Sequence, residues 1–356
     1  MKPTLFSPLN LFFSTCLIIA FLSLVACGKS STASEDARWG SVASTAQIVF
    51  MAEVKVNTLG IRGYELVAMN LDSTNRRQLT DNQEQEFLPH FSPDGTRLLY
   101  TWFTSGGYGV ERSQSRVTIY DFATRSTRDL TNTGKDSYPV WSPDGSQIAF
   151  LSTRDGYQAL WVMNADGSDA HEIGHPTGGN LDFVWGDIAW SSQNWILFVV
   201  AEKGRSDTCF KTRLDKIRPD GTQRMKVTDG GPNCTPAGME QNGDADPGFS
   251  ADGGTIYTSR GFPYRPSGMP SATVRKLYAV SSDAWYPGKP EHDLSLSTAQ
   301  DCIEGVPKGS PDGTRILLFR ACARESAGVT VTDTAGTYRT WIANGFGPDW
   351  NPVWKP

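Results

Sequence analysis

The stretch LPHFSPDGTRLLY at residues 88–100 recurs along the chain and decides its fold. Close copies read YPVWSPDGSQIAF at 138–150 and VPKGSPDGTRILLF at 306–319, and weaker ones read DIAWSSQNWILF at 187–198 and DPGFSADGGTIY at 246–257. The last residues, NPVWKP at 351–356, repeat its first half. The residues before the serine position, called anchors below, are Phe91, Trp141, Trp190, Phe249, Gly309 and Trp354, at spacings of 50, 49, 59, 60 and 45 residues. A regular period of this size indicates stacked supersecondary units.

Each copy predicts two strands joined by a tight turn. Proline presets φ at the second turn position, aspartate caps the turn through its side chain, and glycine adopts the left-handed conformation. Two further strands follow most copies, as in residues 159–165 (ALWVMNA) and 170–173. Four short antiparallel strands per unit of about 50 residues are typical of a β-propeller blade.

The two ends of the repeat region complete each other. Residues 47–51, 64–70 and 76–80 predict three strands that lack an inner strand, and residues 351–354 predict an inner strand that lacks partners. Pairing the last strand with the first ones removes two exposed edges. We therefore expect an all-β fold over residues 45–356: a six-bladed β-propeller of four-stranded antiparallel blades, closed by the C-terminal strand pairing with the first blade.

Composition supports a folded chain and excludes one class of partner. Hydrophobic residues make up 38% of the 356 residues and charged residues 20%, which suffices for a sizeable core. The formal net charge is −5, which excludes a nucleic-acid binder that works through bulk positive charge. The chain has four histidines, so a multi-histidine metal centre has little to draw on.

The first residues predict an export signal with a lipid attachment site. Lys2 precedes an apolar run from Leu11 to Val25, which indicates a signal peptide over residues 1–26. The sequence Leu24-Val25-Ala26-Cys27 resembles the bacterial lipobox, which implies lipidation of Cys27 and an outer-membrane lipoprotein facing the periplasm or the medium. An ordinary secretory signal with a chance cysteine is the alternative. Residues 27–44 are rich in small polar residues and predict a flexible tether.

The repeats resemble those of the TolB-type propeller family, whose signature is a repeated PxWSPDGxxIAF unit. The resemblance covers about residues 45–356, is closest around Ser142-Pro143-Asp144-Gly145, and is weaker in the copies from Asp187 and Asp246. It implies the propeller fold, here without the additional N-terminal α/β domain of TolB. A role in the Tol-Pal system follows from the resemblance less directly than the fold does.

The cysteines are expected to form disulfides in an oxidising compartment. Cys16 lies in the signal and Cys27 would carry lipid, which leaves Cys209, Cys234, Cys302 and Cys322. In a four-stranded blade, the links from strand two to strand three and from blade to blade share one face. That topology predicts the pairs Cys209–Cys234 and Cys302–Cys322, each closing a loop of about 20–25 residues worth ~3 kcal/mol.

The same face receives nearly all the extra chain length, as in the long links 102–115 and 261–273. Loops that lengthen on one face of a rigid scaffold are the usual place for binding. Aromatic and arginine residues, which are enriched at interfaces, predict a partner-binding surface there made of Trp102, Phe103, Tyr108, Arg112, Phe262, Tyr264 and Arg265. The alternative is that these side chains pack on their own loops.

Acids occur five residues before most anchors, where the inner strand of each blade begins; they are Glu86, Asp136, Asp244, Glu304 and Asp349. They are expected to ring the channel mouth on the loop face. One interpretation is a trap for a weakly bound divalent cation or a basic peptide, and no other cofactor or metal is expected. The other is that each acid caps its strand by bonding backbone N–H groups.

These features favour a non-catalytic cell-envelope lipoprotein that binds envelope protein partners through its loop-decorated face. The absence of a GxSxG motif excludes a serine peptidase of the α/β-hydrolase type. The alternative hypothesis is a propeller that binds or cleaves polysaccharide, in the manner of a lyase, through the acidic channel mouth and His90.

Overall fold

The computed structural model describes residues 46–56, 62–82, 84–104, 114–175, 183–203, 210–230, 242–264, 272–296, 302–322 and 325–353. These residues form twenty-four β-strands, and no helix among them is suited to cross a membrane. The all-β class expected from the repeats is therefore confirmed. The expected signal peptide, Cys27 and the tether lie outside the described residues.

Three of the sheets contain four strands each. Their strands, in hydrogen-bonded order, are β24 (Phe346–Trp350), β1 (Ile48–Val56), β2 (Arg62–Met69) and β3 (Arg77–Gln78); β4 (Gln85–Phe91), β5 (Arg97–Phe103), β6 (Ser115–Asp121) and β7 (Ser126–Asp129); and β8 (Asp136–Trp141), β9 (Gln147–Ser152), β10 (Ala159–Asn164) and β11 (His171–Gly174).

The fourth sheet joins three such groups into twelve strands. The groups are β12 (Phe183–Trp190), β13 (Ile196–Lys203), β14 (Phe210–Ile217) and β15 (Met225–Lys226); β16 (Asn242–Phe249), β17 (Thr255–Tyr264), β18 (Ala272–Ser281) and β19 (Glu291–Asp293); and β20 (Cys302–Gly309), β21 (Arg315–Cys322), β22 (Gly328–Asp333) and β23 (Thr340–Ala343). Short parallel pairings connect them, β14 with β16 and β18 with β20. The sequence did not predict these connections between groups.

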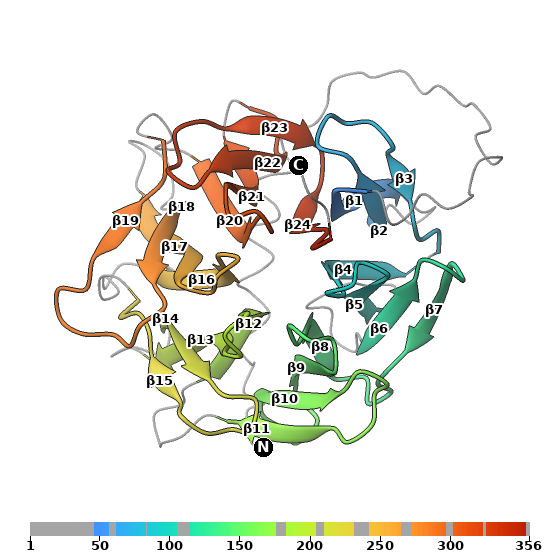
Figure 1. Ribbon diagram of the computed structural model, residues 1–356, viewed down its shortest axis with the longest axis horizontal. Coiled ribbons are helices and arrows are strands. Elements are labelled where there is room, and N and C mark those ends of the chain that lie inside the picture. Colours follow the sequence, from blue (N-terminus) through green and yellow to red (C-terminus); the bar gives the residue numbers. More distant parts are fainter. Residues whose placement is uncertain are drawn as a thin grey trace, which may run out of the picture.

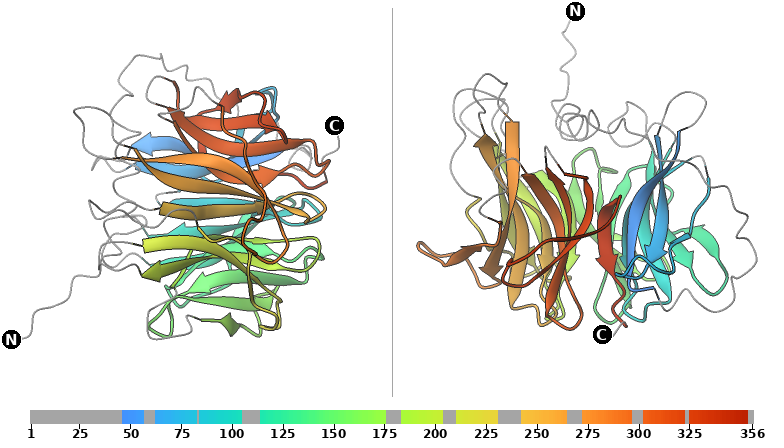
Figure 2. Two further views of the ribbon diagram at one scale, coloured as in Figure 1. Left: turned by 90° about the vertical axis from the view of Figure 1, so that its left-hand side faces the viewer. Right: turned by 90° about the horizontal axis from the view of Figure 1, so that it is seen from above.

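The sheets stand around a common centre, with β4, β8, β12, β16, β20 and β24 nearest to it (Figure 1). Each of these inner strands contacts the next. Seen from the side, the strands run between two faces of the ring (Figure 2). The last described strand meets the first, because β24 pairs antiparallel with β1 at Ile48–Trp350 and Val49–Asp349.

The tight turns after the inner strands have the expected chemistry, and the face that carries them is called the turn face below. In the copy at 138–150, Ser142 Oγ donates to Asp144 Oδ1 at 2.6 Å and Gln147 N donates to Ser142 Oγ at 2.9 Å. The bond from Ser142, with those from Ser146, lowers the pKa of Asp144 to about 2. Gly145 has a φ of 71°, the left-handed value that a glycine accepts without strain. In the degraded copy at 187–198, Asn194 takes this place with a φ of 60°.

The inner strands contain an irregularity that the sequence did not predict. The residue three before the anchor has a positive φ at Leu88, Tyr138, Asp246 and Val306, and the register shifts there. Such bulges re-aim side chains and are frequent next to functional sites.

The register of the last inner strand corrects one expectation. Trp350 pairs with Ile48 as Phe91 pairs with Leu98 and Trp141 with Ile148, so Trp350 is the sixth anchor. The sequence had placed Trp354 there, which lies outside the described residues. Trp350 is 3% exposed and packs with Ile48, Phe50 and Leu317 in one of the apolar clusters between adjacent strand groups.

Candidate binding cavity at the centre of the ring

One of the two expected disulfides falls on described residues. Cys302 and Cys322 are directly opposite each other on β20 and β21 and are joined by a disulfide. Cys209 and Cys234 lie outside the described residues, so their pairing stays a prediction.

The acids at the starts of the inner strands are buried and bonded within the protein. Glu86, Asp136 and Asp244 are each 0% exposed, and Glu304 is 1% exposed. Arg154 Nη2 donates to Asp136 Oδ1 at 2.8 Å. These four carboxylates therefore do not face open solvent as a ring of free charges.

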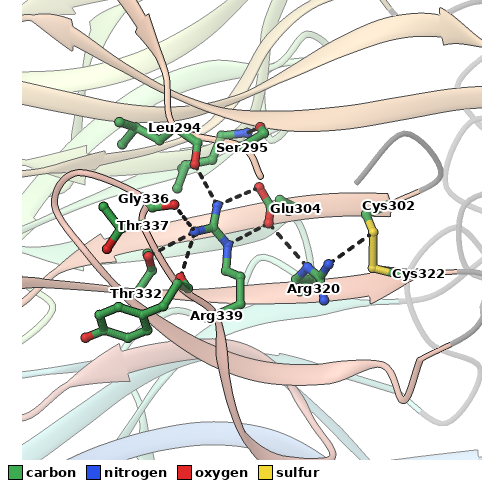
Figure 3. Close-up of polar contacts among 12 residues, drawn as sticks. Leu294, Ser295, Cys302, Glu304, Arg320, Cys322, Thr332, Gly336, Thr337 and Arg339 are labelled. Atoms are coloured by element: carbon green, nitrogen blue, oxygen red, sulfur yellow. Dashed lines mark hydrogen bonds and ion pairs between the residues drawn. A yellow bond between two sulfur atoms is a disulfide. The ribbon is translucent and has the colours of Figure 1, made fainter. Parts of the chain in front are cut away.

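Arginines neutralise two more of these acids with paired bonds. Arg260 donates to Asp244 through Nε at 2.6 Å and Nη2 at 3.1 Å. Arg339 donates to Glu304 through Nε at 2.7 Å and Nη2 at 3.1 Å, and Arg320 lies on the other side of that carboxylate, beside the Cys302–Cys322 disulfide (Figure 3). Bidentate contacts of this kind fix geometry as well as charge.

Glu86 has neutral partners in place of an arginine. Asn82 Nδ2 donates to its Oε1 at 2.6 Å and Thr80 Oγ1 donates to its Oε2 at 3.2 Å. A second carboxyl, that of Glu65, lies beside it and is 1% exposed. Burial, with a further contribution from Glu65, raises the pKa of Glu86 to about 8, and burial also raises the pKa of Glu65.

The structure separates Asp349 from the other acids. Since Trp350 is the anchor of β24, Asp349 occupies the position directly before an anchor, which is the position of His90 on β4. The sequence pattern had grouped Asp349 with the acids five residues before an anchor, and the pairing of β24 with β1 corrects that position.

The aromatic residues expected on the loop face are only partly described. Phe103 is 4% exposed and its ring lies edge-on to that of Phe87, so it belongs to the interior. Trp102 is half-buried, with the Arg116 guanidinium 3.4 Å from its ring centroid. Phe262 is half-buried against Tyr278. Tyr108, Arg112 and Arg265, and the side chain of Tyr264, lie outside the described residues.

A cavity of about 380 Å³ opens at the centre of the ring on the turn face. All six residues that directly precede an anchor line it, namely His90, Val140, Ala189, Gly248, Lys308 and Asp349. Anchors and residues of the tight turns form the rest of its wall, among them Trp190, Phe249, Pro93, Pro311 and Pro352. The position directly before the anchor, which differs from copy to copy, therefore contributes one residue of each repeat unit to the cavity wall.

A cluster of four ionisable side chains lies at this centre. Lys308 Nζ is 3.2 Å from Asp187 Oδ2, His90 Nε2 is 3.9 Å from Asp187 Oδ1, and His90 Nδ1 is 3.8 Å from Asp349 Oδ2. Phe91 N donates to Asp349 Oδ2 at 2.9 Å. We call His90, Asp187, Lys308 and Asp349 the central cluster.

Burial sets the protonation of this cluster. It lowers the pKa of His90 well below its usual value, and the nearby Lys308 ammonium lowers it further, so the imidazole is neutral at pH 7. Burial raises the pKa of Asp349 to about 6, while Lys308 opposes that rise. Nε2 of His90 is buried without a hydrogen-bond partner. At neutral pH the His90 imidazole is therefore neutral and the Asp349 carboxyl is mostly ionised.

Sequence reasoning singled out His90 and Asp349 but missed Asp187 and Lys308. Lys308 had a signal, because it directly precedes an anchor in an otherwise constant phrase. Asp187 had none, since it stands three residues before its anchor in the most degraded copy. Among the described residues, no group of three or more His, Cys, Asp or Glu side chains is arranged to hold a metal ion.

The fold and its central cavity define a protein of the β-propeller type. The family model of the TolB beta propeller domain matches residues 41–260, and the chain belongs to this family. The Tol-Pal system protein TolB of Anaeromyxobacter dehalogenans is 31% identical over 125 residues, which are 35% of this chain and 27% of that protein. An uncharacterized peptidase, YuxL of Bacillus subtilis, is 27% identical over 152 residues, which are 41% of this chain and 22% of the relative. The chain thus covers about a quarter of the length of these curated relatives.

Solved structures show the same fold. TolB from Acinetobacter baumannii has a TM-score of 0.58 at 16% identity, with 86% of this chain and 66% of that chain covered. The hydrazine synthase of Kuenenia stuttgartiensis has a TM-score of 0.59 at 14% identity, with 85% of this chain and 46% of that one covered. Because propellers with such different names share the fold, these likenesses carry no activity to this chain.

Proposed function

We propose that the chain is a non-catalytic cell-envelope lipoprotein, anchored to the outer membrane through Cys27, whose six-bladed propeller binds envelope protein partners. Six groups of four strands and the β24–β1 pairing support six blades and closure by the C-terminal strand. The TolB relative of Anaeromyxobacter dehalogenans, which is named as a protein of the Tol-Pal system, supports an envelope role with protein partners.

The main support for a non-catalytic protein is that three of the acids at the starts of the inner strands are paired with arginines. Asp136, Asp244 and Glu304 are bonded to arginines of the chain itself, which leaves them no free charge for substrate chemistry. A polysaccharide-cleaving activity at that mouth would need such a free carboxylate or base. Bonds of this kind instead stabilise a rigid scaffold for binding.

The partner surface is proposed on the face opposite the turns. The links between second and third strands, and between successive groups, leave the strands on that side. Trp102 and Phe262 lie near the ends of β5 and β17 there, half-buried under Arg116 and beside Tyr278. Aromatic side chains and arginines are enriched at the cores of protein–protein interfaces.

Crosslinking in intact cells followed by pull-down tests this proposal. A crosslinked envelope protein should be recovered with the wild-type chain and lost with the double variant Trp102→Ala, Phe262→Ala. Tyr286→Ala is the matched control, because that ring is 51% exposed elsewhere on the molecule. An unchanged crosslink in the double variant would refute the surface, and cleavage of any glycan in a polyanionic panel would refute the non-catalytic assignment.

Lipidation has its own test. Radiolabelled palmitate should be incorporated into the wild-type chain and not into Cys27→Ser. Release of that variant from the membrane fraction would show that the lipid is the anchor. Labelling that persists in Cys27→Ser would refute the lipid site.

A further inference from the structure

We propose that the central cluster is a binding site for an organic cation, a primary ammonium or a guanidinium group. The site lies at the turn-face end of the inner strands, whereas the proposed protein-binding surface lies at their other end. It therefore goes beyond the proposed function and does not depend on it.

The charges of the cluster favour a cation. Asp187 and Asp349 face a single ammonium, that of Lys308, and the His90 imidazole between them is neutral. Counted by formal charge, two carboxylates against one ammonium leave the cluster one negative charge in excess. Burial raises the pKa of Asp349 to about 6, the nearby Lys308 ammonium offsets that rise only in part, and the Asp187 carboxylate adds to it.

The hydrogen bonds of the cluster show where a donor is missing. A neutral imidazole has one N–H donor and one acceptor nitrogen. His90 directs one ring nitrogen toward Asp187 and the other toward Asp349, at 3.9 Å and 3.8 Å. In either tautomer, an acceptor nitrogen therefore faces a carboxylate oxygen with no hydrogen between them. An ammonium or guanidinium group, which has only donors, supplies bonds to both.

Other ligand classes fit less well. An anion would have to approach Lys308 past two carboxylates. A metal ion would need several free oxygen or nitrogen ligands, and the described residues contain no suitable group of three. The cavity wall adds Trp190 and Phe249, whose rings are half-buried and attract cations through their π-faces.

Access is through Asp349. Its side chain is 17% exposed, while His90 and Asp187 are 7% and 2% exposed. The cation should therefore contact Asp349 first, in a cavity whose volume of about 380 Å³ suits one side chain or a small amine.

Histidine NMR on the full mature chain tests the site directly. The chain has four histidines, and His90 is buried while His171, His175 and His292 are exposed. N-acetyl-lysine amide and N-acetyl-arginine amide should shift the ¹⁵N resonances of His90 saturably. N-acetyl-norleucine amide, of similar length without charge, should not. Butylamine and guanidine as further probes distinguish a free amine from a peptide-borne cation.

Two variants with opposite expected effects on affinity distinguish cation binding from a purely structural role of the cluster. Asp349→Asn keeps the shape and an oxygen acceptor for Phe91 N but removes a charge, and it should weaken binding by about tenfold or more. Lys308→Met keeps the aliphatic stem and frees Asp187, and it should strengthen binding. Asp293→Asn, an exposed acid paired with Lys276, is the matched control and should leave affinity unchanged.

The affinity should also fall as the pH drops below about 6, where Asp349 gains its proton. The groups that face Asp349 are His90, Lys308 and Asp187, and none of them restores the negative charge that Asp349 loses when it gains its proton. No shift of His90 with either cation, an equal shift with the norleucine amide, or loss of affinity in both Asp349→Asn and Lys308→Met would overturn the proposal. The partner-crosslinking experiment on Trp102 and Phe262 is scored separately, so either proposal can fail alone.

Discussion

Glu86 differs from the other buried acids at the starts of the inner strands because its neighbours are neutral or acidic. Asp136, Asp244 and Glu304 each have an arginine, whereas Glu86 has Asn82, Thr80 and the carboxyl of Glu65. A carboxyl in this setting keeps its proton, which it can donate to the neighbouring carboxylate. The consequence is a stability that depends on pH.

The pKa of Glu86 is about 8 in the folded chain, against an ordinary value of 4.5. Its contribution to stability is therefore complete below pH 4.5 and is lost as the pH rises to about 8, by at most ~1.4 kcal/mol per pH unit. Glu86→Gln, which keeps a donor but cannot ionise, should raise the free energy of unfolding at pH 8 and leave it nearly unchanged at pH 4. Urea unfolding across this range measures the difference.

The control for this series is Asp155→Asn, since Asp155 is exposed. Its unfolding free energy should follow the wild-type curve at each pH. If Glu86→Gln and the wild type lose stability in parallel between pH 5 and pH 8, the protonated state of Glu86 is disproved.

The cysteines give a second prediction at the residue scale. Peptide mapping without reduction should recover Cys302 joined to Cys322, the pair present in the structure, and Cys209 joined to Cys234. Replacing Cys302 and Cys322 together by alanine should lower the free energy of unfolding by about 3 kcal/mol, given a sequence separation of 20 residues. A peptide that contains Cys209 bonded to Cys302 would contradict the arrangement of strands proposed for both regions.

At the scale of strands, β16 and β20 approach each other backbone to backbone. A Cβ atom at Gly248 would lie 2.0 Å from Pro307 O, and one at Gly309 would lie 2.6 Å from Phe249 O. Neither glycine has a positive φ, so the requirement is space and not backbone conformation. The close contact brings Lys308 of β20 to the centre of the ring.

Gly248→Ala should therefore separate the two strands and cost about 1–3 kcal/mol of stability, as overpacking does elsewhere. Gly254→Ala is the matched control, because a Cβ there meets only Asp252 side-chain atoms at ordinary distances of 3.4 Å or more. Thermal unfolding of the two variants compares them. Equal melting temperatures would show that β16 and β20 are not held as closely as described.

The strand level also shows where sequence patterns suffice and where they fail. The Ser-Pro-Asp-Gly phrase predicts its turn correctly, since every bond in it is local. The bulges at Leu88 and Tyr138 depend on packing against neighbouring strands, and the parallel pairing of β14 with β16 involves residues about thirty positions apart. Such contacts join residues that are far apart in the sequence, so the local sequence pattern cannot predict them.

For the whole molecule, the central cluster is the feature least accessible to sequence reasoning. Its members come from residues 90, 187, 308 and 349, and only the arrangement of the sheets around a common centre brings them together (Figure 1). The sequence pattern placed His90 on an inner strand correctly. It assigned Asp349 to the wrong end of its strand because GPDWNP and NPVWKP both match the start of the repeat.

That ambiguity makes the closure of the ring testable. Trp350 is 3% exposed, pairs across to Ile48, and donates from Nε1 to Lys308 O at 2.9 Å, so it joins the last strand to both β1 and β20. Asn351 strengthens the same junction by donating from Nδ2 to Ala46 O at 2.9 Å.

Trp350→Ala removes a buried indole and a bond across this junction, and it should lower the free energy of unfolding by about 3–5 kcal/mol. Trp354→Ala is the comparison, because the register read from the sequence makes Trp354 the anchor and predicts the reverse order of effects. Urea unfolding of both variants decides between the registers: a larger loss for Trp354→Ala than for Trp350→Ala would mean that the ring closes four residues later than the β24–β1 pairing indicates.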